Sequence, residues 1–363
     1  MTESYSIVYP RRLVLRFFLR LLGRFLLFVF TRTTVTGAEN LPKSGPLILV
    51  GNHVAVIEAM MMALYTPWPI EVIGTGDIPI DKRFGWAAQA WGFLPVNRGS
   101  VDRQEMQLPI DVLKQDGIVG IFPEGSIWST TMKKAHTGVA WLSYRTNTPI
   151  VPIGYGGTRG AVAAMLAFKR PHLTMNIGKP LPAVNPKVEG KSRKEALAEA
   201  ATAIMVEVEA LIPQDEKEDW NAIQDETFDF TLVIQDGEQQ IEKTVVHPQG
   251  LGRFFHIPVI LDVMARNMQL PVDPLRQIDR THPASEIADA LDAALSFFDN
   301  HPNFLSYRFG YADAGDIREG VIELRDIARE ANSAMIELKP VRRYRTAGGR
   351  QIEEIIPGQM HEM

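Results

Sequence analysis

The chain opens with a segment in which arginine recurs among leucines and phenylalanines. Residues 10–32 read PRRLVLRFFLRLLGRFLLFVFTR, with arginine at every fourth position from Arg12 to Arg24. On an α-helix this spacing keeps the four arginines on one slowly drifting stripe and leaves the other faces apolar. The pattern predicts an N-terminal amphipathic helix within residues 1–32.

Two features of this segment argue against a membrane span. The longest unbroken apolar run, Phe25–Phe30, has six residues, and each arginine at the centre of a bilayer would cost about 2.5–3.5 kcal/mol. No small-residue cleavage site follows, so a signal peptide fits poorly too. Arginine on one face and apolar side chains on the others favour an anionic membrane surface, contacted through residues 10–31. A helix packed on its own domain or on a partner chain is the alternative.

Short apolar runs alternate with longer amphipathic stretches over residues 33–212. The runs are 46–50, 70–74, 92–96, 117–122, 149–155 and 173–178, and glycine or proline punctuates the joins. This alternation predicts an α/β domain with a mostly parallel sheet flanked by helices. Its last helix begins with the capping-box pair Ser192 and Glu195, and we expect Pro213 to stop it.

The remainder of the chain predicts a second, smaller domain of α+β type. An acid-rich stretch, 213–227, has the composition of a solvated linker. The accessory domain, 228–345, would begin with a hairpin over 228–246 that turns at Asp236 and Gly237. We expect helices over 257–269, 284–300 and 317–337, and a solvated tail over 346–363. No catalytic motif is evident here, and the role of this domain is unknown.

The amino-acid composition excludes several kinds of chemistry and indicates the cellular compartment. The chain of 363 residues has no cysteine, which excludes disulfides, thiolate metal ligands and a cysteine nucleophile, and fits a reducing compartment. The net charge is −5. Residues 1–32 carry six arginines against Glu3, so they hold +5 and the rest of the chain −10. The basic residues cluster on an apolar helix without a polar basic groove, so we expect no nucleic-acid partner.

His53 and Glu58 interrupt a segment that otherwise has the composition of buried core, LILVGNHVAVIEAMMMALY. On one continuous helix, residues five apart would point about 140° away from each other. Contact therefore requires His53 on the turn that ends the strand and Glu58 in the following helix. A neutral imidazole could then accept a proton from a hydroxyl while the carboxylate fixes its tautomer. The alternative is a capped helix start, with Glu58 complementing the helix dipole.

Further polar residues follow two other predicted strands. GFLPVNRGS brings Arg98 to the end of the third apolar run, and FPEGS brings Glu124, Gly125 and Ser126 to the end of the fourth. Ligands of open α/β sheets bind at the carboxyl ends of the strands, so we expect these groups to converge. Taken singly, Arg98 could instead form a surface ion pair and Glu124 could be a helix-start carboxylate.

Four ordered blocks together resemble the glycerolipid acyltransferase family, which includes the lysophosphatidic acid acyltransferases. The blocks are NHVAVIE, GFLPVNRG, FPEGS and PIVPIGY, and the resemblance covers about residues 35–180. It implies that His53 is the general base and Glu58 its orienting partner. It also implies that the activated hydroxyl attacks the thioester of acyl-CoA or acyl carrier protein, with no covalent acyl-enzyme and no metal or bound cofactor.

The resemblance also implies a site for the acceptor lipid. Arg98, Glu124 and Gly125 match the positions that the family associates with a glycerol-phosphate acceptor, and we assign Asn52 and Ser126 to substrate binding with them. A guanidinium suits this role because its fork of donors matches phosphate oxygens. The expected reaction is acyl transfer to a lysophospholipid hydroxyl, foremost that of 1-acyl-glycerol-3-phosphate, on the cytoplasmic face of a membrane, by a peripheral or monotopic enzyme.

Two departures from the family pattern bear on the acceptor. The family's usual carboxylate is aspartate, so Glu58, one methylene longer, requires either a helix set further back or a side chain that folds back. The family often has arginine soon after the third block, whereas here Ile127 follows and the next basic pair is Lys133 and Lys134. A different lipid or glycolipid acceptor is therefore an alternative, as is a non-catalytic lipid-binding protein that retains the fold.

Two other enzyme classes fit less well. A Rossmann dehydrogenase could use GYGGTRG, but this stretch lacks the third glycine of the fingerprint, and no acid follows about 20 residues later. A serine hydrolase could use Ser126 with His53, but PEGSI is not the G-x-S-x-G elbow.

Overall fold

The computed structural model describes residues 6–75, 82–96, 106–124, 136–187, 190–218, 223–268, 270–356 and 359–362. The chain divides into two compact units. Unit 1 comprises residues 1–76 and 87–220, and unit 2 comprises residues 221–363 with 77–86.

Unit 1 is built on a mixed, mostly parallel sheet. Among the described residues it has seven strands in the order β1-β7-β6-β2-β5-β3-β4. β7 runs antiparallel to β6 and parallel to β1, whereas the other neighbours are parallel. The strands are β1 (Arg32–Thr36), β2 (Leu47–Gly51), β3 (Ile70–Thr75), β4 (Leu94–Val96), β5 (Ile118–Ile121), β6 (Ile150–Gly156) and β7 (His172–Ile177).

The six apolar runs of the sequence all form strands, so the predicted fold class is confirmed. β1 was not predicted. Its sequence, RTTVT, is rich in threonine and alternates between exposed and half-buried positions at the edge of the sheet. A strand that buries little leaves no apolar run to find.

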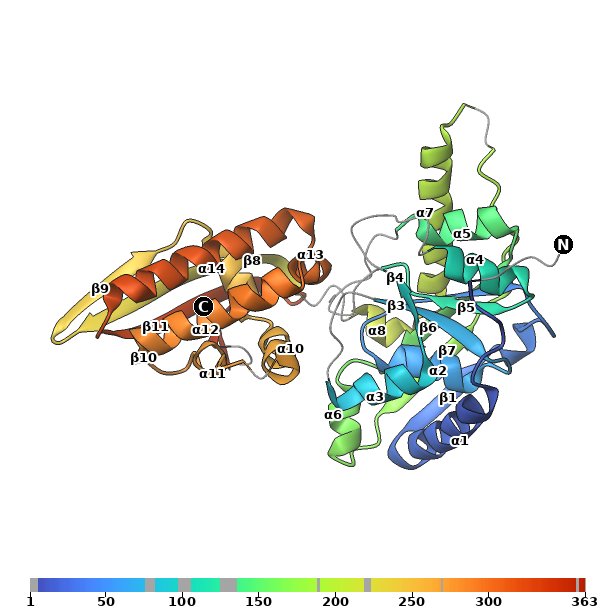
Figure 1. Ribbon diagram of the computed structural model, residues 1–363, viewed down its shortest axis with the longest axis horizontal. Coiled ribbons are helices and arrows are strands. Elements are labelled where there is room, and N and C mark those ends of the chain that lie inside the picture. The colour runs from blue at the N-terminus through green and yellow to red at the C-terminus, as the bar shows by residue number, and fades with distance from the viewer. Residues whose placement is uncertain are drawn as a thin grey trace. The chain divides into compact units, whose positions relative to one another are not determined.

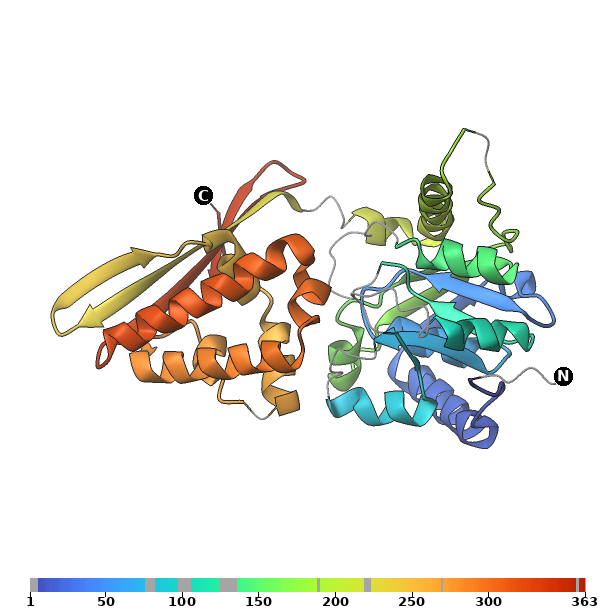
Figure 2. The ribbon, with the colours of Figure 1, turned by 45° about the horizontal axis from the view of Figure 1, so that its top comes forward.

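Helices cover both faces of this sheet (Figures 1 and 2). On one face, Leu47 and Leu49 of β2 pack in a core with α1 and α2, while Ile48 and Val50 face a second core with α4, α5 and α7. Burial on both sides explains why this strand is apolar without alternation. The described helices of residues 1–220 are α1 (Leu13–Phe30), η1 (Ala38–Asn40), α2 (Ile57–Tyr65), α3 (Lys82–Trp91), α4 (Gln107–Lys114), α5 (Gly138–Thr146), α6 (Ala161–Leu166), α7 (Arg193–Leu211) and α8 (Gln214–Glu218).

Helix α7 begins as predicted, but the stretch that follows it is more ordered than a linker. The Ser192 hydroxyl accepts a hydrogen bond from the Glu195 amide, and the Glu195 carboxylate accepts one from the Ser192 amide. The predicted linker, 213–227, contains helix α8 and the first residues of β8. Asp215, Asp225 and Glu226 are compatible with regular structure because they are exposed, while the Glu216 carboxylate accepts a hydrogen bond from the Gly157 amide.

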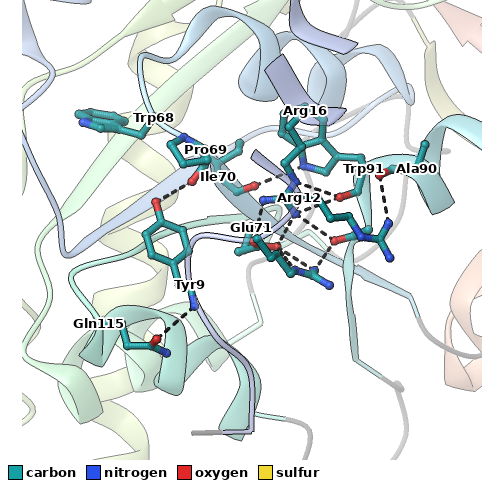
Figure 3. Close-up of polar contacts among 12 residues, drawn as sticks. Tyr9, Arg12, Arg16, Trp68, Pro69, Ile70, Glu71, Ala90, Trp91 and Gln115 are labelled. Carbon is teal, nitrogen blue, oxygen red and sulfur yellow. Dashed lines mark hydrogen bonds and ion pairs between the residues drawn. The ribbon is translucent and has the colours of Figure 1, made fainter. Parts of the chain in front are cut away.

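Helix α1 forms over the predicted residues, but its arginines face the protein. Arg16 is 1% exposed, and its guanidinium pairs with both carboxylate oxygens of Glu71 at 2.7 and 2.8 Å while donating to the Trp91 carbonyl (Figure 3). Arg20 donates to the Trp68 carbonyl at 3.0 Å, and Arg24 to the Leu64 carbonyl at 2.6 Å. The expectation that this stripe faces anionic headgroups is therefore wrong, because these cations satisfy carbonyls and a carboxylate of their own domain.

The apolar faces of α1 are correspondingly exposed. Its outward side chains are Leu13, Val14, Leu15, Phe17, Phe18, Leu21, Leu22, Phe25, Leu26, Phe28 and Val29, whose exposures range from 39% to 76%. The helix is thus amphipathic with its polar stripe inside. Among the described residues, no helix is long and apolar enough to cross a membrane.

Unit 2 is an antiparallel sheet covered by helices. Its strands run in the order β13-β12-β11-β8-β9, with β10 also pairing with β11. They are β8 (Ile223–Asp236), β9 (Gln239–Thr244), β10 (His282–Pro283), β11 (Met335–Thr346), β12 (Gln351–Ile356) and β13 (Gln359–Glu362). The helices are α9 (Pro248–Phe255), α10 (Pro258–Met268), α11 (Asp273–Arg276), α12 (Ala284–Asn300), α13 (Phe304–Phe309) and α14 (Tyr311–Ala331).

Several predictions for this unit are confirmed and two are wrong. The hairpin forms, with its turn at Gly237 and Glu238, and α10 and α12 match the predicted helices. The helix predicted over 317–337 starts earlier and ends at Ala331, because the chain from Met335 alternates apolar side chains along β11.

The predicted solvated tail also belongs to the sheet of unit 2. Arg342 and Arg343 of β11 lie opposite Glu354 and Glu353 of β12. Their cross-strand ion pairs, at 3.0 and 2.6 Å, neutralise the charges that made this stretch resemble a free end.

Candidate active site

Three neighbouring strand ends bring the polar residues of the predicted site together. β2 lies between β6 and β5 and is parallel to both, so the carboxyl ends of these strands meet at one edge of the sheet. β2 leads to His53, β5 to Glu124 and β6 to Thr158. The predicted convergence therefore holds for the described members of the set.

His53 and Glu58 are in contact across the turn between β2 and α2. His53 Nδ1 lies 3.1 Å from Glu58 Oε2, and the Glu58 side chain is fully buried while that of His53 is 16% exposed. The imidazole stacks on the Phe122 ring, with centroids 4.2 Å apart. With Nδ1 engaged by a carboxylate, Nε2 is the ring nitrogen that can accept a proton.

The Glu58 carboxylate is held by several donors besides His53. It accepts hydrogen bonds from the Ala55 amide at 2.9 and 3.0 Å and from the Val54 amide at 3.3 Å. These amides precede the helix that carries Glu58, so the side chain folds back over the start of α2. Of the two ways in which glutamate could replace the family's aspartate, folding back is the one observed.

Thr158 completes this carboxylate site and was not predicted. Its hydroxyl lies 2.5 Å from Glu58 Oε1, and the residue is 1% exposed. It lies in the stretch GYGGTRG, which in sequence is an incomplete dinucleotide fingerprint. The signal that could have identified Thr158 is a hydroxyl residue soon after β6, because β6 is the neighbour of β2, the strand that leads to His53.

Tyr155 lies beneath the same site, on β6. Burial, followed by the nearby charge of Glu58, raises the pKa of its phenol well above the usual 10. Its ring crowds Gly51, where an added Cβ would lie 2.6 Å from a ring carbon. The phenol is therefore neutral and packs as part of the core.

Asn52 and Glu124 make contacts within the site. The Asn52 amide side chain donates to the Tyr155 carbonyl at 3.2 Å and accepts from the Tyr155 amide at 2.8 Å. Glu124 Oε1 accepts from the His53 amide at 2.9 Å, and the residue is 3% exposed. Both residues fix the backbone that carries His53, and their predicted contacts with substrate stay predictions.

The other predicted site residues lie outside the described residues. They are Arg98, Gly125 and Ser126, together with Ile127 and the basic pair Lys133 and Lys134. The prediction that no metal or bound cofactor takes part also stays a prediction.

The loop that carries Thr158 is fixed by its neighbours. The Gly157 amide donates to Glu216 Oε1 of α8 at 2.5 Å. Gly157 has a φ of 70°, and an added Cβ would lie 1.8 Å from the His172 carbonyl oxygen, so only glycine fits here. Next to this loop is a small pocket lined by Asn52, Val54, Glu124, Tyr155, Arg159, Ile212 and Glu216.

Comparison with known proteins identifies the family. The family model described as Acyltransferase matches residues 32–156. A 1-acyl-sn-glycerol-3-phosphate acyltransferase of Bacillus subtilis is 25% identical over 182 residues, which cover 50% of this chain and 89% of the relative. Residues 32–156 are an acyltransferase domain. The resemblance seen in the four sequence blocks is thus confirmed, and this glycerolipid acyltransferase is an enzyme that transfers acyl groups.

Two further similarities are more partial. A chloroplastic 1-acyl-sn-glycerol-3-phosphate acyltransferase of Brassica napus, BAT2, is 27% identical over 154 residues, covering 41% of this chain and 44% of the relative. Among solved structures, the 1-acyl-sn-glycerophosphate acyltransferase PlsC of Thermotoga maritima has a TM-score of 0.39 and 17% identity, covering 55% of this chain and 83% of that one. The family match of this acyltransferase ends at residue 156 and does not reach the main part of unit 2, residues 221–363.

Proposed function

We propose that this acyltransferase moves a fatty acyl group from acyl-CoA or acyl carrier protein to the free hydroxyl of 1-acyl-glycerol-3-phosphate. The observation that carries the proposal is the contact between His53 and the buried Glu58 at the edge of the sheet. The names of the curated relatives support the acceptor. An acceptor without a phosphomonoester is the alternative.

In the proposed reaction, His53 acts as general base. Nε2 takes the proton of the acceptor hydroxyl as the oxygen attacks the thioester carbonyl, and the Glu58 carboxylate stabilises the resulting imidazolium through Nδ1. The C–O bond then forms as the C–S bond breaks. The thiolate leaves with the proton that the imidazolium returns, so His53 ends neutral and no acyl-enzyme is required.

The acceptor phosphate would be held by residues at the same edge. We assign this role to Arg98, whose fork of donors matches phosphate oxygens, with Gly125 and Ser126 beside it. Asn52 and Glu124 would also position His53, through their contacts with the Tyr155 and His53 backbones.

We further propose that the enzyme works at the cytoplasmic face of a membrane, as a peripheral or monotopic protein. Support comes from the outward apolar faces of α1, which include Phe17, Phe25 and Phe28 at 64%, 60% and 76% exposure. Contiguous exposed apolar surface on this scale marks an interaction site. A membrane fits because both acceptor and product are lipids.

The decisive experiment measures product formation by the purified protein in detergent micelles. Labelled acyl-CoA and acyl carrier protein are each offered with 1-acyl-glycerol-3-phosphate, with lysolipids lacking a phosphomonoester and with glycolipids. We expect phosphatidic acid as the main product, and a rise in acceptor KM that exceeds the rise in donor KM for Arg98→Ala. Product from the other acceptors alone would establish the alternative, and no transfer by folded protein would indicate a lipid-binding role.

A further inference from the structure

The end of helix α6 carries two large apolar side chains on the surface. Leu166 is 71% exposed and Phe168, two residues later, is 76% exposed. Both belong to unit 1. Single exposed apolar residues are ordinary, so the case for a function depends on their backbone, their neighbours and their charge environment.

The backbone at Phe168 is in a conformation that phenylalanine rarely adopts. Its φ is 56°, and that of Arg170 is 45°. The left-handed region is unfavourable for a residue with a side chain, and glycine or asparagine is the usual occupant. Here the residue in this conformation is a bulky ring that belongs to no hydrophobic core and stays 76% exposed.

The end of α6 is continuous with the apolar faces of α1. The rings of Phe168 and Phe30 have centroids 5.4 Å apart. Arg170 donates to the Phe28 carbonyl at 3.1 Å and to the Thr31 carbonyl at 3.2 Å, which ties the two helix ends together. In Figures 1 and 2, α1 and α6 lie on the same side of the sheet.

The charge around α6 suits an anionic surface. Residues 159–171, which comprise α6 and its flanks, contain Arg159, Lys169 and Arg170 but no aspartate or glutamate, in a chain of net charge −5. Lys169 and Arg170 are exposed directly beside Phe168. Apolar side chains bordered by cations are the pattern of a segment that enters the headgroup region of a bilayer.

We propose that Leu166 and Phe168 form a second membrane anchor, continuous with α1, and that Lys169 contacts anionic headgroups beside it. This inference rests on the proposed membrane association of α1. Whereas Arg16, Arg20 and Arg24 of α1 are turned inward, Lys169 is exposed beside Phe168, so we assign the dependence on anionic lipid to this cation. α6 follows closely after Thr158, the partner of Glu58. The anchor therefore fixes how deeply the His53 site lies against the membrane.

The absence of cysteine from the chain allows a direct test. Single cysteines replace Phe168, Phe25 of α1 or Val206 in the full-length protein, and each carries an environment-sensitive fluorophore. Val206 is the matched control, because it is 56% exposed on α7, whose core-facing side chains pack on the opposite face of the sheet. On vesicles of phosphatidylcholine with phosphatidylglycerol we expect a blue shift and a severalfold brighter emission at 168 and 25, with no change at 206.

Each other outcome has a definite meaning. A response at 25 without one at 168 overturns the second anchor and leaves α1 as the anchor. No response at either position overturns membrane association as well, while acyl transfer in detergent decides the enzymatic proposal separately. A response at 168 that grows with protein concentration in the absence of vesicles shows that a second copy covers the surface, and overturns the inference.

A paired substitution measures the strength of the anchor. We expect Leu166→Ser with Phe168→Ser to lower the vesicle partition coefficient about tenfold or more, because two large side chains no longer leave water. Lys169→Gln should weaken binding to vesicles containing phosphatidylglycerol and leave binding to pure phosphatidylcholine unchanged. Val206→Ser should change neither, and unchanged partitioning of the double variant would overturn the inference.

Discussion

The Thr158 hydroxyl donates a 2.5 Å hydrogen bond to Oε1 of Glu58, the oxygen that does not face His53. The two residues are 100 positions apart in the chain, and they meet because β2 and β6 are parallel neighbours. The bond leaves Oε2 directed at the imidazole. Thr158 is in this sense a positioning residue, because it acts on His53 through the carboxylate.

Removing the Thr158 hydroxyl should slow turnover without weakening substrate binding. For Thr158→Val, which keeps the shape, we expect kcat to fall about tenfold with acceptor and donor KM unchanged, because Glu58 loses a charge-assisted bond. Thr158→Ser should recover most of the rate. A merely structural role would instead lower the melting temperature of the valine variant in parallel with its activity and give no recovery with serine.

Shortening the carboxylate side chain should be damaging even though the charge remains. Glu58 folds back to accept from the amides of Val54 and Ala55 while also reaching His53 and Thr158. An aspartate on the same backbone is one methylene shorter and cannot make all of these contacts. We expect Glu58→Asp to lower kcat about a hundredfold in a steady-state assay. Near-normal turnover would mean that the helix start moves to restore the contact.

Separate substitutions of His53 and Glu58 distinguish the role of the base from that of its carboxylate partner. His53→Ala should abolish nearly all turnover, because it removes the imidazole that Glu58 holds at this edge. Glu58→Gln keeps size but loses the charge that stabilises the imidazolium, so kcat should fall by about two to four orders of magnitude. Circular dichroism of both variants controls for folding. Intact activity in the folded variants would show that His53 and Glu58 are only a capped start of α2.

The sheet and part of the site could be predicted because their signals are local. Strands buried on both faces leave apolar runs, and polar residues at the ends of parallel strands mark the site, as with His53 and Glu124. Thr158 could not be assigned from its own surroundings, since its role depends on which strands are neighbours. The threonine-rich β1 and the charged β12 were missed because their polar side chains are compensated across strands.

The orientation of α1 shows a further limit of sequence patterns. Periodicity identifies an apolar and a polar stripe, but it does not say which one faces the protein. Here Glu71, fully buried on β3, determines that the arginine stripe of α1 faces the protein, because a buried carboxylate requires cationic partners. Glu71 lies 55 residues from Arg16 in the chain, and only the fold brings them together.

The ion pair between Arg16 and Glu71 should be essential to stability. Arg16→Met leaves Glu71 buried with only the partly exposed Arg11 as partner, and losing one member of a buried pair costs about 3–5 kcal/mol. We expect a loss of this size in the free energy of unfolding, measured by urea denaturation. Arg12→Gln is the control, because Arg12 is exposed and donates only to carbonyls of α3, so its loss should cost little.

Membrane binding through α1 should depend on its phenylalanines and hardly on salt. Since Arg16, Arg20 and Arg24 are engaged within the domain, raising the salt concentration cannot weaken a contact between them and lipid, whereas apolar burial is not screened. Removing residues 1–32 is a poor test, because it would leave Glu71 without partners. We therefore expect Phe17→Ser with Phe28→Ser to lower flotation on neutral vesicles at least tenfold, at low and at high salt alike. Unaltered flotation of this folded variant, or complete release of the native protein from neutral vesicles by salt, would show that α1 does not hold the membrane through its apolar face.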